Sequence, residues 1–459
     1  MDSSTTTAQL STSSASSLSS SSNETSNNIN SNHSIPPTIT PGATTTSSSS
    51  VPIDYEAVSQ MLAPFDCPFS ADELYTVQQQ IELSRFDILD TDQHMEKVGY
   101  GVYPLTTLYI QHSCRPNTGI IYRQDKQRII ALDDIAVGDV ITISYVDLTL
   151  PRDARMNELQ RRFGVEYDCQ CERCHGPFSC LDQLLERGQQ SGLRIDQATA
   201  ILEEDITRWD TSEVVTYLTS KAFDGTIPVD AKLYPSELSH YVANFIAPDV
   251  YIEGSTTMEP TFITRQLVGI GGINSFESYA AFAKQARKNF IQGIPPLLTK
   301  LLTCNEVPVF TVNMIRAAEV ALRKLMDHQQ WLEAARCATF LFIMYRIMYP
   351  PLHPVCSFHT IVLAKASWNS LIQLELQSAT SSSASSVSST SNSNNNGLHH
   401  NYSNNNGLDV KLEKNYLNGI RTWIDISRDA TLLTFGQDST LWREVVDLQW
   451  VFERDQKLR

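Results

Sequence analysis

The sequence predicts an α+β fold in which a β-rich segment precedes an all-α domain. Short runs rich in Val, Ile, Thr and Tyr, separated by turn residues, fill residues 98–146. Beyond Cys180, apolar residues recur at helical spacing almost throughout. Two tracts, 1–50 and 377–407, consist mainly of Ser, Thr, Asn, Ala and Gly. We expect both tracts to be disordered, because so little apolar surface cannot offset the entropy of ordering.

Composition excludes several classes of protein. Among 459 residues, 35 Lys and Arg stand against 51 Asp and Glu, a net charge of −16, so we expect no sequence-specific nucleic-acid partner. The N-terminus lacks the basic start and apolar centre of a signal peptide, and the longest apolar run, 337–345, is far shorter than the roughly 20 residues of a spanning helix. We therefore expect neither secretion nor a membrane span. Nine cysteines then suit a reducing compartment.

The first elements follow from local patterns. The capping-box sequence Ser70-Ala71-Asp72-Glu73 predicts a short helix that ends near Leu83. Four β-rich runs follow, at residues 102–110, 118–122, 128–132 and 140–146.

A polar helix is predicted to begin at Pro151, with Met156, Leu159 and Phe163 on one face. Basic and acidic residues are mixed along the rest of this helix, which favours a solvated face over a binding patch. The arginines concerned are Arg152, Arg155, Arg161 and Arg162.

The helical region contains two apolar stripes, at 315–325 and 331–345, joined by a short polar connector. This pattern predicts an antiparallel helical hairpin that stops at the prolines of 350–354. The spacing is near that of a tetratricopeptide unit, although ordinary helical bundles give the same stripes. Further helices are expected from about Cys356 and, after the second tract, at 410–433 and 440–452.

Three cysteines, Cys169, Cys171 and Cys174, lie within six residues. Thiolates this close in sequence can converge on one zinc ion, and a closed tetrahedral site requires a fourth ligand from elsewhere. Spacing alone leaves Cys114, His175 and Cys180 as candidates. The alternative is a chance cluster of free thiols.

Residues 111–117, Gln-His-Ser-Cys-Arg-Pro-Asn, are the most specific string in the chain. They resemble the N-H-S-C-x-P-N signature of SET-domain lysine methyltransferases. Residues 99–104 upstream and 135–147 downstream, followed by the Arg-rich helix and the cysteine cluster, keep the order of the SET-and-MYND (SMYD) subfamily. The similarity covers about 84–174 and continues more weakly through helical character and the His353-Pro354 segment.

The resemblance implies a partial SET domain at 51–147, a post-SET zinc segment at 148–180 and a tetratricopeptide-like helical domain at 181–459, with 377–407 as an insertion. It assigns structural zinc to Cys114, Cys169, Cys171 and Cys174, which leaves His175 and Cys180 as bystanders.

The resemblance also implies roles in methyl transfer. Tyr145 matches the tyrosine beside the transferred methyl, and Phe86 lines the lysine channel. Binding of S-adenosylmethionine is implied for Ser84, Gln111, His112 and Tyr167. Such a channel suits the chemistry, because a lysine with a pKa of about 10.4 must lose its proton and an aromatic, desolvated site favours that loss. The alternative for Phe86 and Tyr145 is an ordinary role as strand-core aromatics.

The chain also departs from the family pattern. No Gly-rich cofactor strand and no cysteine-rich MYND module precede Phe86, and Gln111 and Ser84 stand where the family has asparagines. We therefore expect a SET-type protein that is catalytically incomplete, either as a partial version of a methyltransferase or as a non-catalytic, zinc-stapled helical scaffold that binds a protein partner. The family implies a histone or other protein substrate and residence in the cytoplasm, the nucleus or both.

Overall fold

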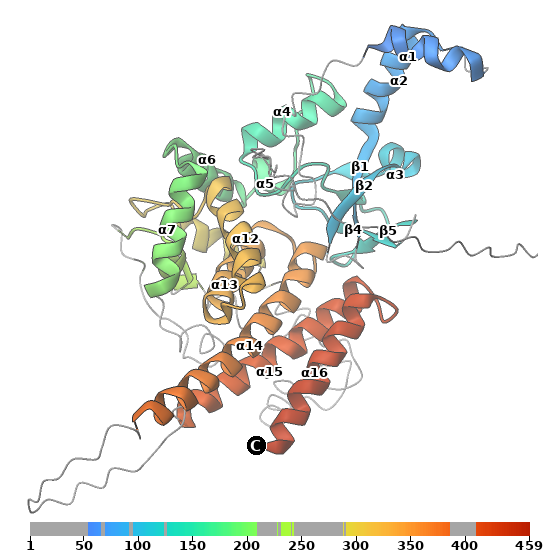
Figure 1. The fold of residues 1–459 in the computed structure, drawn as a ribbon. Helices are drawn as coiled ribbons and strands as arrows, with labels where there is room; N and C mark the ends of the chain where they lie inside the picture. The colour runs from blue at the N-terminus through green and yellow to red at the C-terminus, as the bar shows by residue number, and fades with distance from the viewer. Residues whose placement is uncertain are drawn as a thin grey trace, which may run out of the picture. The chain divides into compact units, whose positions relative to one another are not determined.

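The computed structural model describes residues 54–65, 69–90, 95–123, 126–208, 227, 231–239, 241–242, 288, 291–385 and 410–459. All of them fall in one compact unit. The fold class is α+β, as predicted: after two N-terminal helices, the strands of two small sheets precede the long helices (Figure 1).

Side-chain caps start the first two helices, α1 (Tyr55–Leu62) and α2 (Ala71–Ser84). Asp54 caps α1 by accepting hydrogen bonds from two backbone N–H groups. At α2, Ser70 Oγ accepts from the N–H of Glu73 at 3.3 Å, and Glu73 Oε2 accepts from the N–H of Ser70 at 2.8 Å. These reciprocal bonds confirm the predicted capping box.

The larger sheet has the strand order β2-β1-β4-β5 (Figure 1). Strand β1 pairs antiparallel with β2 and parallel with β4, and β4 and β5 form an antiparallel hairpin. The runs 118–122 and 128–132 are confirmed as β4 and β5, whereas β1 was not predicted. The bounds are β1 Arg85–Asp90, β2 Glu96–Val102, β4 Thr118–Arg123 and β5 Lys126–Ala131.

A second sheet joins β3 (Gln111–His112) in parallel to β6 (Thr142–Ile143). Asn117, the last residue of the signature string, fixes this pairing. Its side chain donates to the carbonyl of Val140 at 2.9 Å and accepts from the N–H of Thr142 at 2.8 Å. Because the two strands run in the same direction, the residues after β3 lie next to the residues after β6.

Two predicted strands are wrong in extent. Most of the run 102–110 is helix α3 (Pro104–Tyr109), and only β6 is strand within 140–146. Pro104 occupies a first-turn position, where its fixed φ suits a helix and its missing N–H costs nothing, and this outweighs the β propensity of its neighbours. After β6 the backbone forms a local turn instead of a ladder, with Ser144 Oγ donating to the carbonyl of Val146 at 2.7 Å.

Helices α4, α5, α6 and α7 lead from the sheets into the helical region. Helix α4 follows Pro151 and buries Met156 and Leu159, as predicted. The prediction of a solvated arginine face is wrong for Arg155, which has no exposed surface. Arg155 precedes Leu159 by one helical turn and therefore borders the buried face. The bounds are α4 Arg152–Phe163, α5 Glu172–His175, α6 Ser179–Gln190 and α7 Ile195–Arg208.

Helices α12 (Val312–Asp327) and α13 (Trp331–Met348) confirm the predicted hairpin. Their short connector includes Gln329, whose φ is 57°. The three later helices confirm the other helical predictions (Figure 1). They are α14 Pro354–Ser385, α15 Val410–Thr434 and α16 Thr440–Leu458.

Helix α14 extends into the tract 377–407 that was predicted to be disordered, and it ends at Ser385. An established helix adds Ala and Ser at little cost, and no Gly or Pro stops it before Ser385. Residues 386–409 and the tract 1–50 lie outside the described residues. No helix in the described part of the chain has the length and apolar character needed to cross a membrane.

One hydrophobic core connects the β-rich part with the helices, from Phe86 in β1 to Phe452 in α16. Gly119 in β4 allows close packing, because a Cβ at this position would lie 2.9 Å from Cδ of Pro354 at the start of α14. At the end of β4, Arg123 pairs with Asp438 at 3.2 Å. The core therefore continues across residue 180, where the resemblance implies a domain boundary.

Candidate functional site

The four cysteines predicted to bind zinc lie together. The Sγ atoms of Cys114, Cys169, Cys171 and Cys174 are all within 4.8 Å of one another. The Sγ atoms of Cys114 and Cys174 are 3.7 Å apart. Zinc–sulfur bonds of about 2.3 Å in a tetrahedron place sulfurs about 3.8 Å apart. The spacing and chemistry of this four-cysteine cluster thus fit one zinc ion.

Local backbone structure gathers these thiols. Cys171 precedes the short helix α5, and its carbonyl accepts from the N–H of Cys174 at 3.0 Å. This tight turn keeps the two side chains close. Cys114 reaches the same point from the loop after β3, which is fixed by the bond from the Ser113 N–H to the Ile143 carbonyl at 2.9 Å.

Neither of the other two candidate ligands belongs to the cluster. His175 lies on the surface, with Nε2 3.3 Å from a carboxylate oxygen of Asp168. Cys180 is buried and its Sγ donates to the carbonyl of Pro177 at 3.2 Å. The structure thus brings Cys114, and neither of these residues, to the three clustered cysteines.

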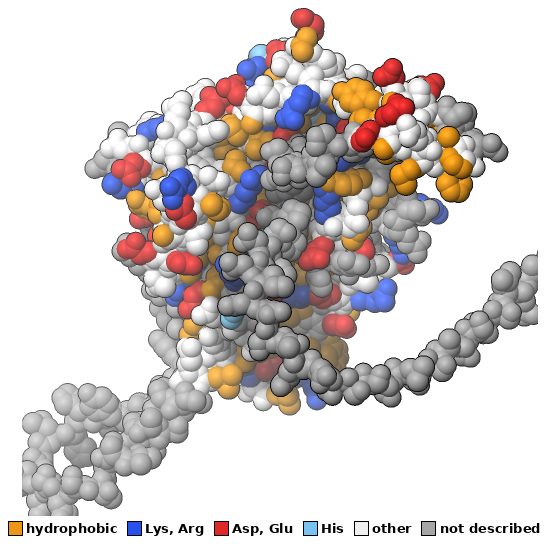
Figure 2. Space-filling model, turned by 45° about the horizontal axis from the view of Figure 1, so that its top comes forward, with side chains coloured by type: hydrophobic (Ala, Val, Ile, Leu, Met, Phe, Trp, Pro, Cys, Tyr) orange, Lys and Arg blue, Asp and Glu red, His pale blue; other side chains and the backbone are white. Residues whose placement is uncertain are grey.

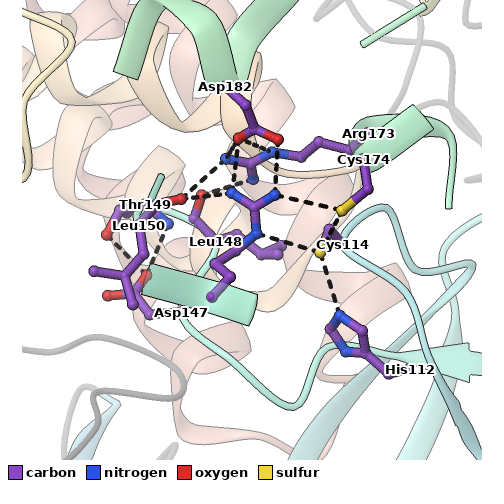
Figure 3. A network of polar contacts seen from close by, with 10 residues as sticks. His112, Cys114, Asp147, Leu148, Thr149, Leu150, Arg173, Cys174 and Asp182 are labelled. Carbon is purple, nitrogen blue, oxygen red and sulfur yellow. Dashed lines mark hydrogen bonds and ion pairs between the residues drawn. The ribbon is translucent and has the colours of Figure 1, made fainter. Parts of the chain in front are cut away.

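Two buried arginines border the four-cysteine cluster (Figure 3). Arg155 Nε donates to Cys114 Sγ at 3.2 Å, and its two terminal nitrogens donate to the two carboxylate oxygens of Asp182 at 2.7 and 2.8 Å. Arg173 also donates to Asp182, at 3.0 and 3.1 Å, and to the carbonyl of Leu148 at 2.7 Å. We name Arg155, Arg173 and Asp182 the arginine clamp.

His112 connects the four-cysteine cluster to Tyr145. Its Nδ1 accepts from the backbone N–H of Tyr145 at 3.2 Å, and its Nε2 lies 3.2 Å from Cys114 Sγ (Figure 3). Since Nδ1 is the acceptor, Nε2 carries the proton and donates to sulfur. Burial lowers the pKa of His112 to about 3, so the ring is neutral. His112, whose side chain was predicted to bind a cofactor, therefore uses both ring nitrogens for contacts within the protein.

Phe86 and Tyr145 face each other, with ring centroids 5.5 Å apart. The Tyr145 hydroxyl lies 3.0 Å from the carbonyl oxygens of both Thr106 and Ile110 and donates its proton toward them. Burial raises the pKa of Tyr145 to about 12, so the hydroxyl keeps its proton. Phe86, predicted to line the lysine channel, and Tyr145, predicted to lie beside the transferred methyl, thus form one buried aromatic pair.

The pair borders a cavity of about 390 Å³ that lies between the β-rich part and the helices. Arg162 also lines it, with its guanidinium carbon 5.0 Å from the ring centre of Tyr145 and 5.7 Å from that of Phe86. Burial lowers the pKa of Arg162, but the side chain stays charged at neutral pH. Tyr349 and His353 also line the cavity. A cation of the protein itself therefore lies against both aromatic rings.

Only some of the residues predicted to bind the cofactor lie near Tyr145. Tyr167 contacts Phe163 at 5.0 Å between ring centroids, and Phe163 contacts Tyr145 at 5.3 Å. The side chain of Gln111 is exposed, and the described contacts do not connect Ser84 with the other three residues. Of the set Ser84, Gln111, His112 and Tyr167, only the last two contact the aromatic group or its backbone.

Sequence reasoning missed the arginine clamp and the cavity residue Arg162. Two signals were present. Arg155 lies one helical turn before the apolar residue Leu159, and Asp182 is the one charged residue in the stretch 180–185, which includes Leu181 and Leu184. A single charge inside an apolar helical stripe indicates a buried partner.

Large apolar side chains are exposed on α2, β2 and α3. Figure 2 shows hydrophobic side chains among charged ones on the face that carries the N-terminal helices. Leu105, Leu108 and Tyr109 of α3 are each at least 73% exposed. Exposed apolar side chains in this number are typical of a face that another segment or partner covers.

Comparison with known proteins gives consistent relatives. The chain is 24% identical over 279 residues to a histone-lysine N-methyltransferase of Arabidopsis thaliana, ASHR1, covering 60% of this chain and 49% of that protein. It is 27% identical over 143 residues to human histone-lysine N-methyltransferase SMYD3, covering 31% and 32%. A SET and MYND domain-containing protein of Dictyostelium discoideum is 34% identical over 87 residues, 19% of this chain and 22% of that protein.

Over the matched segments, the chain is similar to lysine methyltransferases and SET and MYND domain-containing proteins. Its match spans about half or less of the length of these relatives. No protein-family model matches the chain. The chain combines a β-rich part with a helical region. Arg155 connects the four-cysteine cluster to helix α6 of the helical region, because it contacts both Cys114 and Asp182.

Proposed function

We propose that this chain carries the SET-type site for methyl transfer from S-adenosylmethionine to a lysine of a histone or another protein, and that the site is catalytically incomplete. The aromatic pair Phe86 and Tyr145 at the 390 Å³ cavity carries the proposal. Two relatives of the chain are named as histone-lysine N-methyltransferases, which supports the same proposal. Residence in the cytoplasm, the nucleus or both belongs to the same proposal.

The residues of the pair suit the preparation of a lysine amine. Aromatic faces attract a cation, and burial beside them favours the neutral amine over the ammonium ion. The protonated hydroxyl of Tyr145 is held by the carbonyls of Thr106 and Ile110, so its oxygen has a fixed position from which to orient an amine. Such alignment supplies most of the rate in well-oriented displacement reactions.

The chain offers part of a surface for the cofactor. S-adenosylmethionine, when bound, supplies an electrophilic methyl group on a sulfonium. Tyr167, half-buried beside Phe163, offers an aromatic face suited to adenine. The exposed side chain of Gln111 is the remaining polar candidate. Tyr167 and Gln111 therefore suit the adenine end of S-adenosylmethionine.

We assign structural zinc to Cys114, Cys169, Cys171 and Cys174. Four Sγ atoms within 4.8 Å of one another support this assignment, and a closed four-sulfur site leaves no open position for catalysis. The ion would fix the post-SET segment to the loop after β3.

Two features support catalytic incompleteness. The apolar residues of α3 and β2 are exposed, as expected if part of the cofactor pocket is absent. In addition, Arg162 lies over the same ring faces that a substrate lysine would need. The second feature also favours the alternative function, a zinc-stapled scaffold that binds a protein partner without methylating it.

Binding of S-adenosylmethionine to the full chain tests the proposal. We expect weak binding that Tyr167→Ala removes and that Gln111→Asn strengthens about fivefold, the scale of one net hydrogen bond of about 1 kcal/mol. No methyl transfer to histone or peptide lysines should be detected. Transfer that Tyr145→Phe abolishes would overturn incompleteness, whereas absence of any cofactor binding would favour the scaffold.

A further inference from the structure

Arg155 is buried without any exposed surface, and all its described hydrogen bonds go to two kinds of acceptor. One kind is oxygen, from the Leu150 carbonyl at 2.6 Å and from both carboxylate oxygens of Asp182. The other kind is sulfur, from Cys114 at 3.2 Å and from Cys174 at 3.7 Å. A buried guanidinium needs such partners because burial of an unpaired charge is costly.

Asp182 determines where Arg155 points. Its carboxylate binds Arg155 at two oxygens and also binds Arg173, so it is fixed from two sides (Figure 3). The nearest oxygen of Asp182 is 2.7 Å from Arg155, and no described contact joins Asp182 to a cysteine. Asp182 lies on α6 in the helical region, whereas Cys114 follows β3.

We propose that Arg155 is a positioning residue for the metal centre, and that Asp182 holds Arg155 against the sulfurs of Cys114 and Cys174. This inference rests on the proposed zinc assignment. Metal-bound thiolates are more negative than thiols and therefore accept a stronger hydrogen bond from a guanidinium. The arginine clamp thus favours the metal-bound cluster, and the helical region contributes to metal affinity through Asp182.

The variants Arg155→Gln and Asp182→Asn test this role in the full chain. Substitution of outer partners of metal ligands typically weakens metal binding about 10- to 100-fold. We expect a loss of this size in each variant, although Asp182 touches no sulfur. The matched control is Arg161→Gln, which removes an exposed arginine from the same helix. It should change affinity less than about twofold.

Affinity is measured by titration with Co²⁺, whose thiolate absorption bands report tetrahedral sulfur binding, and by competition of Zn²⁺ with a chelator. Far-ultraviolet circular dichroism shows whether each variant is folded. The double variant Arg155→Gln with Asp182→Asn sharpens the test. If Asp182 acts through Arg155, the double variant binds no more weakly than Arg155→Gln alone.

Native affinity in both single variants would overturn the inference, as would additive losses in the double variant. If those variants do not fold, Arg155→Lys decides the matter. Lysine keeps the charge but cannot bind Asp182 and Cys114 together. Faster zinc release from Arg155→Lys supports the inference, and an unchanged rate overturns it. Failure of the unaltered chain to bind Co²⁺ or Zn²⁺ would instead remove the zinc assignment, and the inference with it.

Discussion

The backbone N–H of Tyr145 donates to Nδ1 of His112 at 3.2 Å, while Nε2 of the same ring lies 3.2 Å from Cys114 Sγ. One imidazole thus connects the proposed catalytic tyrosine to the four-cysteine cluster. His112→Ala leaves a buried N–H without its acceptor and removes a donor to sulfur. We expect a loss of about 1–3 kcal/mol in the free energy of unfolding, measured with urea. The control His328→Ala alters an exposed histidine and should have little effect; equal losses would contradict this role.

Cys171→Ser should release the metal. It removes one of four sulfurs, whereas Cys304→Ser alters a buried cysteine outside the cluster. We expect about one zinc per chain in the unaltered protein and in Cys304→Ser, and much less in Cys171→Ser, by elemental analysis. The melting temperature should fall with the zinc content, because metal binding stabilises the folded state. A zinc-free Cys171→Ser protein with native melting temperature would show that the ion is not structural.

Glu319 should make stability fall as pH rises. Burial raises its pKa to about 8, and its Oε1 accepts a hydrogen bond from the Tyr345 hydroxyl at 2.6 Å. Between the unfolded value of about 4.3 and the folded value, only the folded state keeps the proton, so unfolding releases it. The free energy of unfolding should therefore decrease by up to about 1.4 kcal/mol per pH unit over this range.

Glu319→Gln should remove this pH-dependent part of the free energy of unfolding. Urea unfolding at about pH 5 and about pH 8 gives the comparison, and the unaltered protein should lose more stability between them than the variant. Parallel losses in both proteins would show that Glu319 does not hold its proton in the fold.

Replacement of residues 386–409 by a short Gly-Ser linker should leave the melting temperature nearly unchanged. The tract is polar and low in complexity, and loop-closure entropy changes slowly with length. The control Ile420→Ala alters a fully buried side chain of α15 and should cost about 2–5 kcal/mol. A large drop in melting temperature on tract replacement would mean that the tract contributes to the fold.

Sequence patterns predict the long helices well, because repeated apolar spacing and caps act locally. They predict the four-cysteine cluster through spacing and family order, and Phe86 and Tyr145 through family order alone. Helix α3 was not predicted, because Pro104 starts a helix among residues that favour strands. The ion pair of Arg155 and Asp182 was not predicted, because the two residues lie on different helices. In addition, a helix of mixed charge usually faces solvent.

The shared core from Phe86 to Phe452 has a consequence for how the protein can be divided. A fragment that ended near residue 180 would lack the helical residues that share this core, and it would leave Arg155 without Asp182. Such a fragment would aggregate instead of folding. Calorimetry of the intact chain should therefore record a single cooperative melting transition, in which the sheets and the helices lose their structure together.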